Sequence, residues 1–183
     1  MSKTRNNRKK KQVYTRKHYQ SNDGMLTSVW GPSAWHFLHT MSFNYPVKPT
    51  CDDKRNYRDY ILSLRYVLPC GKCRTNLCVN LKRLPLLYKH MKNRTTFSKY
   101  IYNLHEIINE MLGKKSGLSY DNVRDRYEHF RSRCRITNKE PVLSEEKGCT
   151  EPVYGEKSKC ILQIVPQSKK CETFNIDNKC KIN

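Results

Sequence analysis

"TFSKYIYNLHEIINEMLG", residues 96–113, is a stretch in which apolar side chains recur at helical intervals. Tyr100, Leu104 and Ile108 stand four positions apart, which places their side chains on one face of an α-helix. Gly113 stands where such a helix usually ends, because glycine adopts the left-handed conformation of a C-cap without strain. The stretch therefore predicts an amphipathic helix over about residues 96–112.

Other segments between residues 28 and 134 show the same helical periodicity. Helices are expected at about residues 31–44, 53–67 and 70–84, and a shorter one should begin after Ser119, a favourable N-cap residue. Glycine is scarce in this region and proline marks the segment edges, so the strand and helix alternation of a parallel sheet is missing. The sequence predicts an all-α fold in which these helices form a bundle.

Composition divides the chain into three parts. Residues 1–27 carry eight Lys or Arg and one Asp, so we expect a basic, disordered N-terminal arm. Residues 28–134 form the helical domain, and residues 135–183 are a cysteine-bearing, irregular C-terminal extension. The extension contains one strand candidate, "CILQIV", at residues 160–165.

The formal charge of the 183-residue chain is +20, and 37% of its residues are hydrophobic. This content permits one modest core. The chain has neither a run of eighteen apolar residues nor an apolar N-terminal stretch, so we expect no membrane segment and a cytoplasmic protein. The basic arm is also typical of nuclear import signals and of polyanion-binding tails, and we expect nucleic-acid contact through that arm only.

Residues 68–73, "LPCGKC", place two cysteines three positions apart after a proline. Such a pair binds zinc, forms a static disulfide or exchanges electrons as a reversible disulfide. The proline favours a helix start, so Cys70 and Cys73 should lie in the first helical turn. The positive end of the helix dipole lowers a thiol pKa there, and the charges of Lys72 and Arg74 add to this effect. The position suits thiol–disulfide exchange.

Three other interpretations of the pair compete with thiol–disulfide exchange. A structural zinc site needs four ligands, usually as two close pairs, and the chain has no second CxxC pair, so we expect no metal. A thioredoxin-like domain needs a strand before the motif, and the pattern predicts none there. A structural disulfide stays open, because spacing alone does not separate it from a redox pair.

Two motifs rich in aromatic residues and histidine flank the pair, "WGPSAWHFLHTMSFNYP" at 30–46 and "LHEIINEMLGK" at 104–114. With "PCGKC" between them, these motifs resemble the Erv/ALR family of FAD-linked sulfhydryl oxidases in order and spacing. The family patterns are W-G-x-x-x-W-x-x-L-H, Y-P, P-C-x-x-C and H-N-x-x-N-x-x-L-G-K. The resemblance covers about residues 28–134. It implies a bundle of four helices plus a short fifth that holds FAD, usually as a homodimer. The extension makes the chain more similar to the branch of large cytoplasmic DNA viruses.

The resemblance also implies a set of site residues. Cys70 and Cys73 would form the catalytic redox disulfide, with Cys73 against the isoalloxazine ring. The implied FAD contacts are Trp30, Trp35, His39, Tyr45, Cys73, His105, Asn109, Lys114 and Tyr127. Two positions depart from the family pattern, since Glu106 stands where Asn is usual and Tyr120 stands where cellular members carry the first cysteine of a structural disulfide.

The implied activity is the oxidation of thiols by O2, written 2 RSH + O2 to RSSR + H2O2. The expected partners are O2 and dithiol-containing protein substrates, with a thioredoxin-like redox protein as one candidate, and a viral member would work in the host cytoplasm or the virion. The alternative is a non-enzymatic basic helical protein that binds nucleic acid and uses the CxxC pair as a structural staple. Aromatic residues at inward helical positions argue against that alternative, because a binding face combines aromatics with Lys and Arg.

Seven further cysteines lie outside the pair, and Cys134 is expected to be free or bonded elsewhere, because Tyr120 stands in place of its family partner. For the four that lie after residue 148, Cys149, Cys160, Cys171 and Cys180, we expect mutual structural disulfides, since shuttle pairs are usually closely spaced. A shuttle role is the alternative. Cys51 and Cys78 are expected to take no part in the chemistry.

Overall fold

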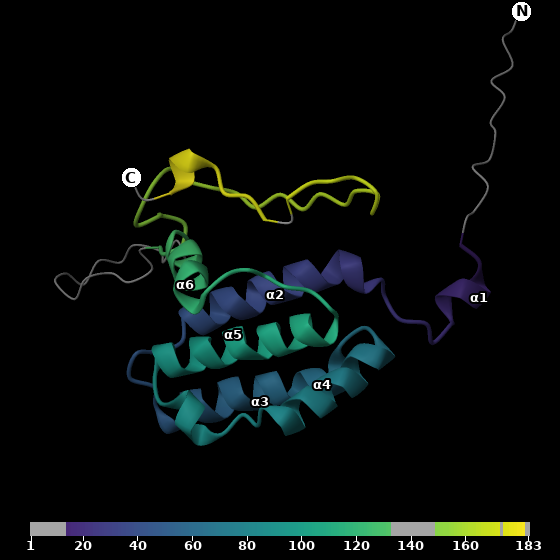
Figure 1. The fold of residues 1–183 in the computed structure, drawn as a ribbon, viewed down its shortest axis with the longest axis horizontal. Coiled ribbons are helices and arrows are strands. Elements are labelled where there is room, and N and C mark those ends of the chain that lie inside the picture. Colours follow the sequence, from purple (N-terminus) through teal and green to yellow (C-terminus); the bar gives the residue numbers. More distant parts are fainter. Residues whose placement is uncertain (1–13, 133–148, 173, 182–183) are drawn as a thin grey trace, which may run out of the picture.

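The computed structural model describes residues 14–132, 149–172 and 174–181. The helices are α1 (Arg16–Tyr19), α2 (Thr27–Phe43), α3 (Cys51–Val67), α4 (Gly71–Arg83), α5 (Arg94–Met111) and α6 (Tyr120–Glu128), with the 3-10 helices η1 (Tyr88–Met91) and η2 (Asn178–Cys180). Figure 1 shows α2 to α5 as a bundle, with the short α6 standing across the end of α2 and α5. The predicted all-α fold, a four-helix bundle with a short fifth helix and an irregular extension, is confirmed.

Three helices begin at side-chain caps that can be read from the sequence. Thr50, Asn93 and Ser119 each accept a hydrogen bond from the backbone N–H three residues later, and that later residue's side chain accepts from the cap's own N–H. Each cap satisfies donors that a helix start leaves unpaired and contributes about 1 kcal/mol. The caps thus fix the residues at which α3, α5 and α6 begin.

Helix α2 begins four residues before the predicted start. The N–H groups of Val29 and Trp30 both donate to the Leu26 carbonyl, at 3.0 and 3.4 Å, so the first turn is already closed before Pro32. Gly31 and Pro32 are typical of helix starts, which explains the late prediction. The proline removes one backbone donor but does not end the helix.

The core lies between α2, α3, α4 and α5. Phe97, Ile101 and Met91 have no exposed surface, and the apolar face of α5 also supplies Tyr100 and Leu104, which are 2% and 3% exposed. The other members of this cluster are Tyr45, Ile61, Leu77, Leu81 and Leu86. Burial of this apolar surface provides the main stabilisation of the bundle, and it fixes the face that α2 and α5 turn toward each other.

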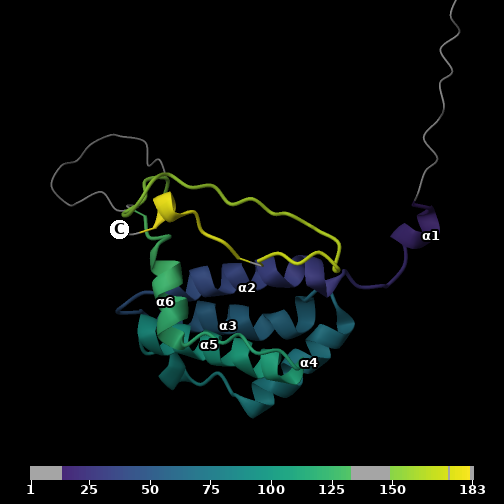
Figure 2. The ribbon, with the colours of Figure 1, turned by 45° about the horizontal axis from the view of Figure 1, so that its top comes forward.

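The C-terminal extension lies over α2. Figure 2 shows its described part running along α2 and turning back. The prediction of a strand at residues 160–165 is wrong: this segment is extended but pairs with no strand among the described residues, and Ile161, Leu162 and Ile164 are each 74% exposed. Its apolar alternation was therefore insufficient, because a strand also needs a neighbouring strand to pair with.

The N-terminal arm is partly regular. Arg16–Tyr19 form α1, and Thr27 already belongs to α2, so residues 14–27 are not uniformly irregular as expected. Residues 1–13, which carry most of the basic run, lie outside the described residues. Within the described part of the chain, no helix has both the length and the apolar content that crossing a bilayer requires.

Candidate redox and aromatic site

The CxxC pair opens helix α4. Cys70 is the N-cap residue, and its sulfur accepts a hydrogen bond from the Cys73 N–H at 3.2 Å. Cys70 and Cys73 are joined by a disulfide across three positions, and both are half-buried. The pair therefore lies where the sequence predicts, at the end of the helix whose unpaired N–H groups stabilise a thiolate.

Charged and hydroxyl groups surround the disulfide. The Arg74 guanidinium folds back and donates to the Leu68 carbonyl at 2.5 Å, which keeps a positive charge beside the first turn of α4. The Thr27 hydroxyl, at the start of α2, lies 3.5 Å from the Cys73 sulfur. This side-chain contact links the start of α2 to the disulfide at the start of α4.

Four of the predicted site residues come together from three helices. Trp35 on α2 stacks on His105 of α5, with ring centroids 3.9 Å apart and planes 6° from parallel. His39, one turn further along α2, is hydrogen-bonded to His105 through Nε2 and Nδ1 at 2.9 Å. Tyr127 of α6 packs on His39 with ring centroids 5.3 Å apart. These rings form a continuous aromatic surface along α2.

The two paired histidines are uncharged near neutral pH. Burial, together with the nearby imidazoles of His105 and His36, lowers the pKa of His39 to about 3. Burial also lowers the pKa of His105 to about 4, against the opposing effect of the Glu106 carboxylate. The Nδ1 atom of His39 is buried and has no hydrogen-bond partner within the described structure. The site therefore contains one polar atom able to bond a ligand.

These pKa values predict that the folded protein loses stability in acid. In the unfolded chain both histidines bind protons at the usual pKa of 6.5, whereas in the folded chain they do so only at about 3 and 4. Between these values the unfolded chain binds more protons, so the free energy of unfolding should fall as the pH falls from 6.5 toward 4. Denaturant titrations across this range measure the slope. His105→Phe should make the slope shallower, and an unchanged slope would contradict this account.

The remaining predicted contacts are more dispersed. Asn109 lies one turn beyond His105 on α5 and donates to the Glu106 carboxylate at 3.1 Å. Lys114 follows the Gly113 turn, where φ is 67°, and its backbone N–H donates to the Asn109 carbonyl at 2.8 Å. Because the chain turns there, Lys114 remains near the end of α5 beside the site, and its charge lowers the pKa of His105.

Trp30 and Tyr45 lie outside the aromatic surface. Trp30 donates through its indole N–H to the Met25 carbonyl at 3.0 Å, so it braces the segment that precedes α2. Tyr45 is fully buried, packs on Tyr57 and Phe97, and donates its hydroxyl to the Met91 carbonyl at 2.9 Å. The resemblance implies that both contact FAD, and in this structure each side chain also has a hydrogen-bond partner within the protein.

Sequence reasoning missed several rings of the surface. His36 packs against Tyr127 and Phe130, and Phe43 stacks on Tyr127 with ring centroids 5.5 Å apart. Phe174 of the extension packs on His36 and Tyr127 and so covers the outer side of the cluster. His36 stands three positions before His39, a spacing that could have identified it, whereas Phe174 lies in an irregular segment without a periodic signal.

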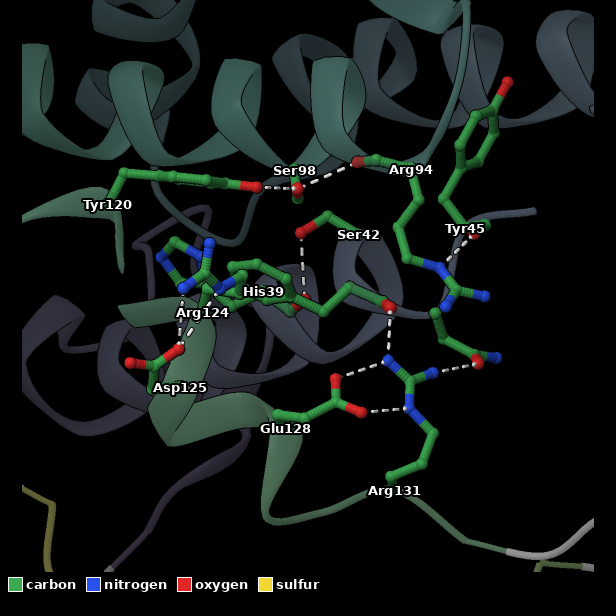
Figure 3. A network of polar contacts seen from close by, with 12 residues as sticks. His39, Ser42, Tyr45, Arg94, Ser98, Tyr120, Arg124, Asp125, Glu128 and Arg131 are labelled. Atoms are coloured by element: carbon green, nitrogen blue, oxygen red, sulfur yellow. Dashed lines mark hydrogen bonds and ion pairs between the residues drawn. The ribbon is translucent and has the colours of Figure 1, made fainter. Parts of the chain in front are cut away.

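An ion-pair network fixes α6, and with it Tyr127, to the end of α2. The Arg131 guanidinium pairs with Glu128 at 2.8 Å and donates to the Phe43 carbonyl at 3.1 Å, as Figure 3 shows. A positive charge at the C-terminus of α2 also complements the helix dipole. On the other side of α6, the Tyr120 hydroxyl is hydrogen-bonded to Ser98 of α5 at 2.8 Å. Tyr120 thus docks α6 at the position where the family pattern has a cysteine.

The extension's cysteines do not form the expected set of mutual disulfides. Cys160, Cys171 and Cys180 are free thiols, and Cys149 alone among the four is disulfide-bonded. The prediction was wrong because an extended segment that runs along α2 and turns back holds its cysteines apart unless regular pairing aligns them. Cys51 and Cys78 are also free, and Cys134 lies outside the described residues. In the part of the chain that the structure describes, no three His, Cys, Asp or Glu side chains gather in a way that could hold a metal ion.

Several known proteins are similar to this chain. A probable FAD-linked sulfhydryl oxidase of Acanthamoeba polyphaga mimivirus is 40% identical over 91 residues, which are 50% of this chain and 64% of that protein. A putative FAD-linked sulfhydryl oxidase of Invertebrate iridescent virus 6 is 28% identical over 90 residues, 47% of this chain and 81% of that protein. The crystal structure of the yeast Erv1 core matches with a TM-score of 0.51 at 18% identity, over 64% of this chain and 96% of that one. The last comparison shows a shared fold.

The sequence pattern that defines the Erv1 / Alr family matches residues 32–128. This range is more than half of the chain and contains the CxxC pair, the Trp35, His39 and His105 cluster, and Tyr127. The chain belongs to the Erv1 / Alr family.

Proposed function

We propose that this protein is an FAD-linked sulfhydryl oxidase that introduces disulfide bonds into dithiol-containing proteins with O2 as the final electron acceptor. The observation that carries the proposal is the Cys70–Cys73 disulfide at the start of α4, held against the helix that also bears the aromatic surface. The names of the mimivirus and iridescent virus relatives support it. The first of these relatives is matched over just under two thirds of its length.

The residues present fit FAD. Trp35, His105 and Tyr127 offer flat rings on which an aromatic ligand can stack. The unpartnered, buried Nδ1 of His39 provides a polar contact that otherwise carries a desolvation cost. Asn109 and Lys114 lie at the same end of α5 and would contact the nucleotide. When bound, FAD supplies a two-electron acceptor that O2 can reoxidise.

The chain's own residues carry the exchange steps. A substrate thiolate attacks the Cys70 sulfur, the Cys70–Cys73 bond breaks, and its electron pair leaves on the Cys73 sulfur. The substrate is then bonded to Cys70, and its second thiolate displaces Cys70, which completes the substrate disulfide and leaves both cysteines reduced. The N-terminus of α4 and the nearby Arg74 stabilise the thiolates that form.

Charge and family membership suggest partners and location. The +20 charge favours encounter with acidic dithiol proteins, one of which could be a thioredoxin-like redox protein. We propose a homodimer as the working form, and the host cytoplasm or the virion as its place of action, because relatives at 40% and 28% identity are viral. Nucleic-acid contact or nuclear import would act through the basic arm.

The alternative function is a non-enzymatic nucleic-acid-binding protein with a structural CxxC pair. Its support was the charge of the chain, and the comparisons give it none. Trp35 and Tyr127 pack on histidines rather than standing among exposed Lys and Arg, as a stacking platform for bases would require. The sulfhydryl oxidase is therefore the better supported of the two functions.

Oxygen uptake tests the proposal. The purified protein, supplied with FAD and reduced dithiothreitol, should consume O2 and release one H2O2 for each disulfide formed. Heat-denatured protein with the same amount of FAD serves as the control for free flavin. Oxygen uptake no faster than in this control would overturn the proposal.

A further inference from the structure

A short segment ahead of α2 lies directly on the redox motif. The Met25 N–H donates to the Pro69 carbonyl at 2.7 Å. A Cβ added to Gly24 would stand 2.9 Å from the Pro69 carbonyl oxygen and 3.2 Å from the Cys70 Cα, so only glycine permits this approach. The segment is thus fixed to the backbone of the residues that precede α4.

This attachment places Thr27 over the disulfide. Thr27 is the first residue of α2, and its hydroxyl oxygen lies 3.5 Å from the Cys73 sulfur. A disulfide sulfur carries no proton, so the hydroxyl is the donor. A threonine side chain is stiff at χ1, and the Thr27 methyl carbon lies 3.6 Å from the position of a Cβ on Gly31, which leaves the hydroxyl on the side of Cys73.

Each sulfur of the pair therefore has its own hydrogen-bond donor. Cys70 accepts from the backbone N–H of Cys73, and Cys73 accepts from the Thr27 side chain. The two donors come from different helices, α4 and α2. Replacing Thr27 by a residue without a hydroxyl removes the donor to Cys73 and leaves the donor to Cys70 in place.

We propose that Thr27 is a positioning residue that stabilises the Cys73 thiolate and thereby directs substrate attack to Cys70. The proposal rests on the oxidase function proposed above. When the substrate sulfur bonds to Cys70, the Cys70–Cys73 bond breaks and its electron pair moves to Cys73. The Thr27 hydroxyl donates to that charge, as hydrogen bonds to charged groups are stronger than those to neutral ones. Cys73 thus becomes the preferred leaving group.

The thiol pKa of each cysteine tests the proposal separately from turnover. Alkylation rates against pH are measured without O2 on the reduced protein, peptide by peptide by mass spectrometry, which separates the pair from the other thiols. In a Cys70→Ser background, Thr27→Val should raise the Cys73 pKa by about one unit, as expected for a lost hydrogen bond to a thiolate. In a Cys73→Ser background, the same substitution should leave the Cys70 pKa unchanged.

Two further variants complete the design. Thr27→Ser retains the hydroxyl and should restore the Cys73 pKa, whereas Thr27→Ala, a smaller replacement, should raise it as valine does. Lys72 and Arg74 of α4 and Asp23 ahead of α2 are the charged groups of the packed segments, and every variant retains them. An unchanged Cys73 pKa in Thr27→Val and Thr27→Ala, or equal shifts of Cys70 and Cys73, would overturn the proposal. Because no flavin turnover enters the readout, this result is independent of whether the protein is an oxidase.

Discussion

Cys73→Ser is expected to abolish thiol-dependent oxygen uptake, by a factor on the order of a thousand or more. Serine at this position cannot form the disulfide with Cys70 that accepts electrons from the substrate. Its hydroxyl would also be a far poorer leaving group than a thiolate, so no exchange could follow attack on Cys70. Cys70→Ser should fail to the same extent, because it removes the sulfur that the substrate attacks. Initial rates with dithiothreitol measure both losses.

A matched control lies on the same helix. Cys78 of α4 is a half-buried free thiol, and Cys78→Ser should keep an oxidation rate close to that of the unmodified protein. Rates of Cys73→Ser and Cys78→Ser that fell by equal factors would point to general damage to α4. Retained turnover in Cys73→Ser would show that the CxxC pair is a structural staple.

Trp35→Ala should release FAD, which is the second large effect that we expect. The substitution removes the ring that stacks on His105 at 3.9 Å and frees that imidazole from its fixed orientation. The His39–His105 hydrogen bond would loosen as well, since both imidazoles depend on the same packing. An aromatic pair together with its buried surface contributes about 1.5 to 3 kcal/mol, so the FAD dissociation constant should rise about ten- to a hundredfold.

Trp30→Phe tests whether Trp30 contacts FAD, as the resemblance implies, or only supports the segment ahead of α2. The resemblance implies that Trp30 contacts FAD, whereas the structure shows it bonded to the Met25 carbonyl outside the aromatic surface. FAD retention after gel filtration should therefore persist in Trp30→Phe and be lost in Trp35→Ala. Thermal melts of the FAD-free forms check that both variants fold. The reverse pattern of retention would contradict the placement of the site.

The parts of the fold that depend on local chemistry could be predicted from the sequence. Ser119 begins α6 because a hydroxyl cap satisfies the first helical donors, and the four-residue repeat through Leu104 marks the buried face of α5. The start of α2 was missed, because an internal proline gives the same local signal as a helix start. Local signals thus locate helices well but can displace their ends.

The site was predicted to the extent that it depends on periodicity. Trp35 and His39 share a face of α2, and the resemblance added His105 and Tyr127 from other helices. Phe174 could not be found in this way, because its place over Tyr127 depends on the path of an irregular segment. Thr27 could not be found either, since its contact with Cys73 joins residues 46 positions apart in the sequence. Such contacts follow from tertiary packing and not from spacing.

The visible spectrum of the purified protein tests the central claim most directly. A bound flavin should give a band near ~450 nm that bleaches when dithiothreitol is added without O2 and returns when air is admitted. In Cys73→Ser the band should be present, but the same concentration of dithiothreitol should bleach it far more slowly than in the unmodified protein. This result would identify the Cys70–Cys73 disulfide as the point of electron entry. A colourless protein that takes up no added FAD would contradict the account.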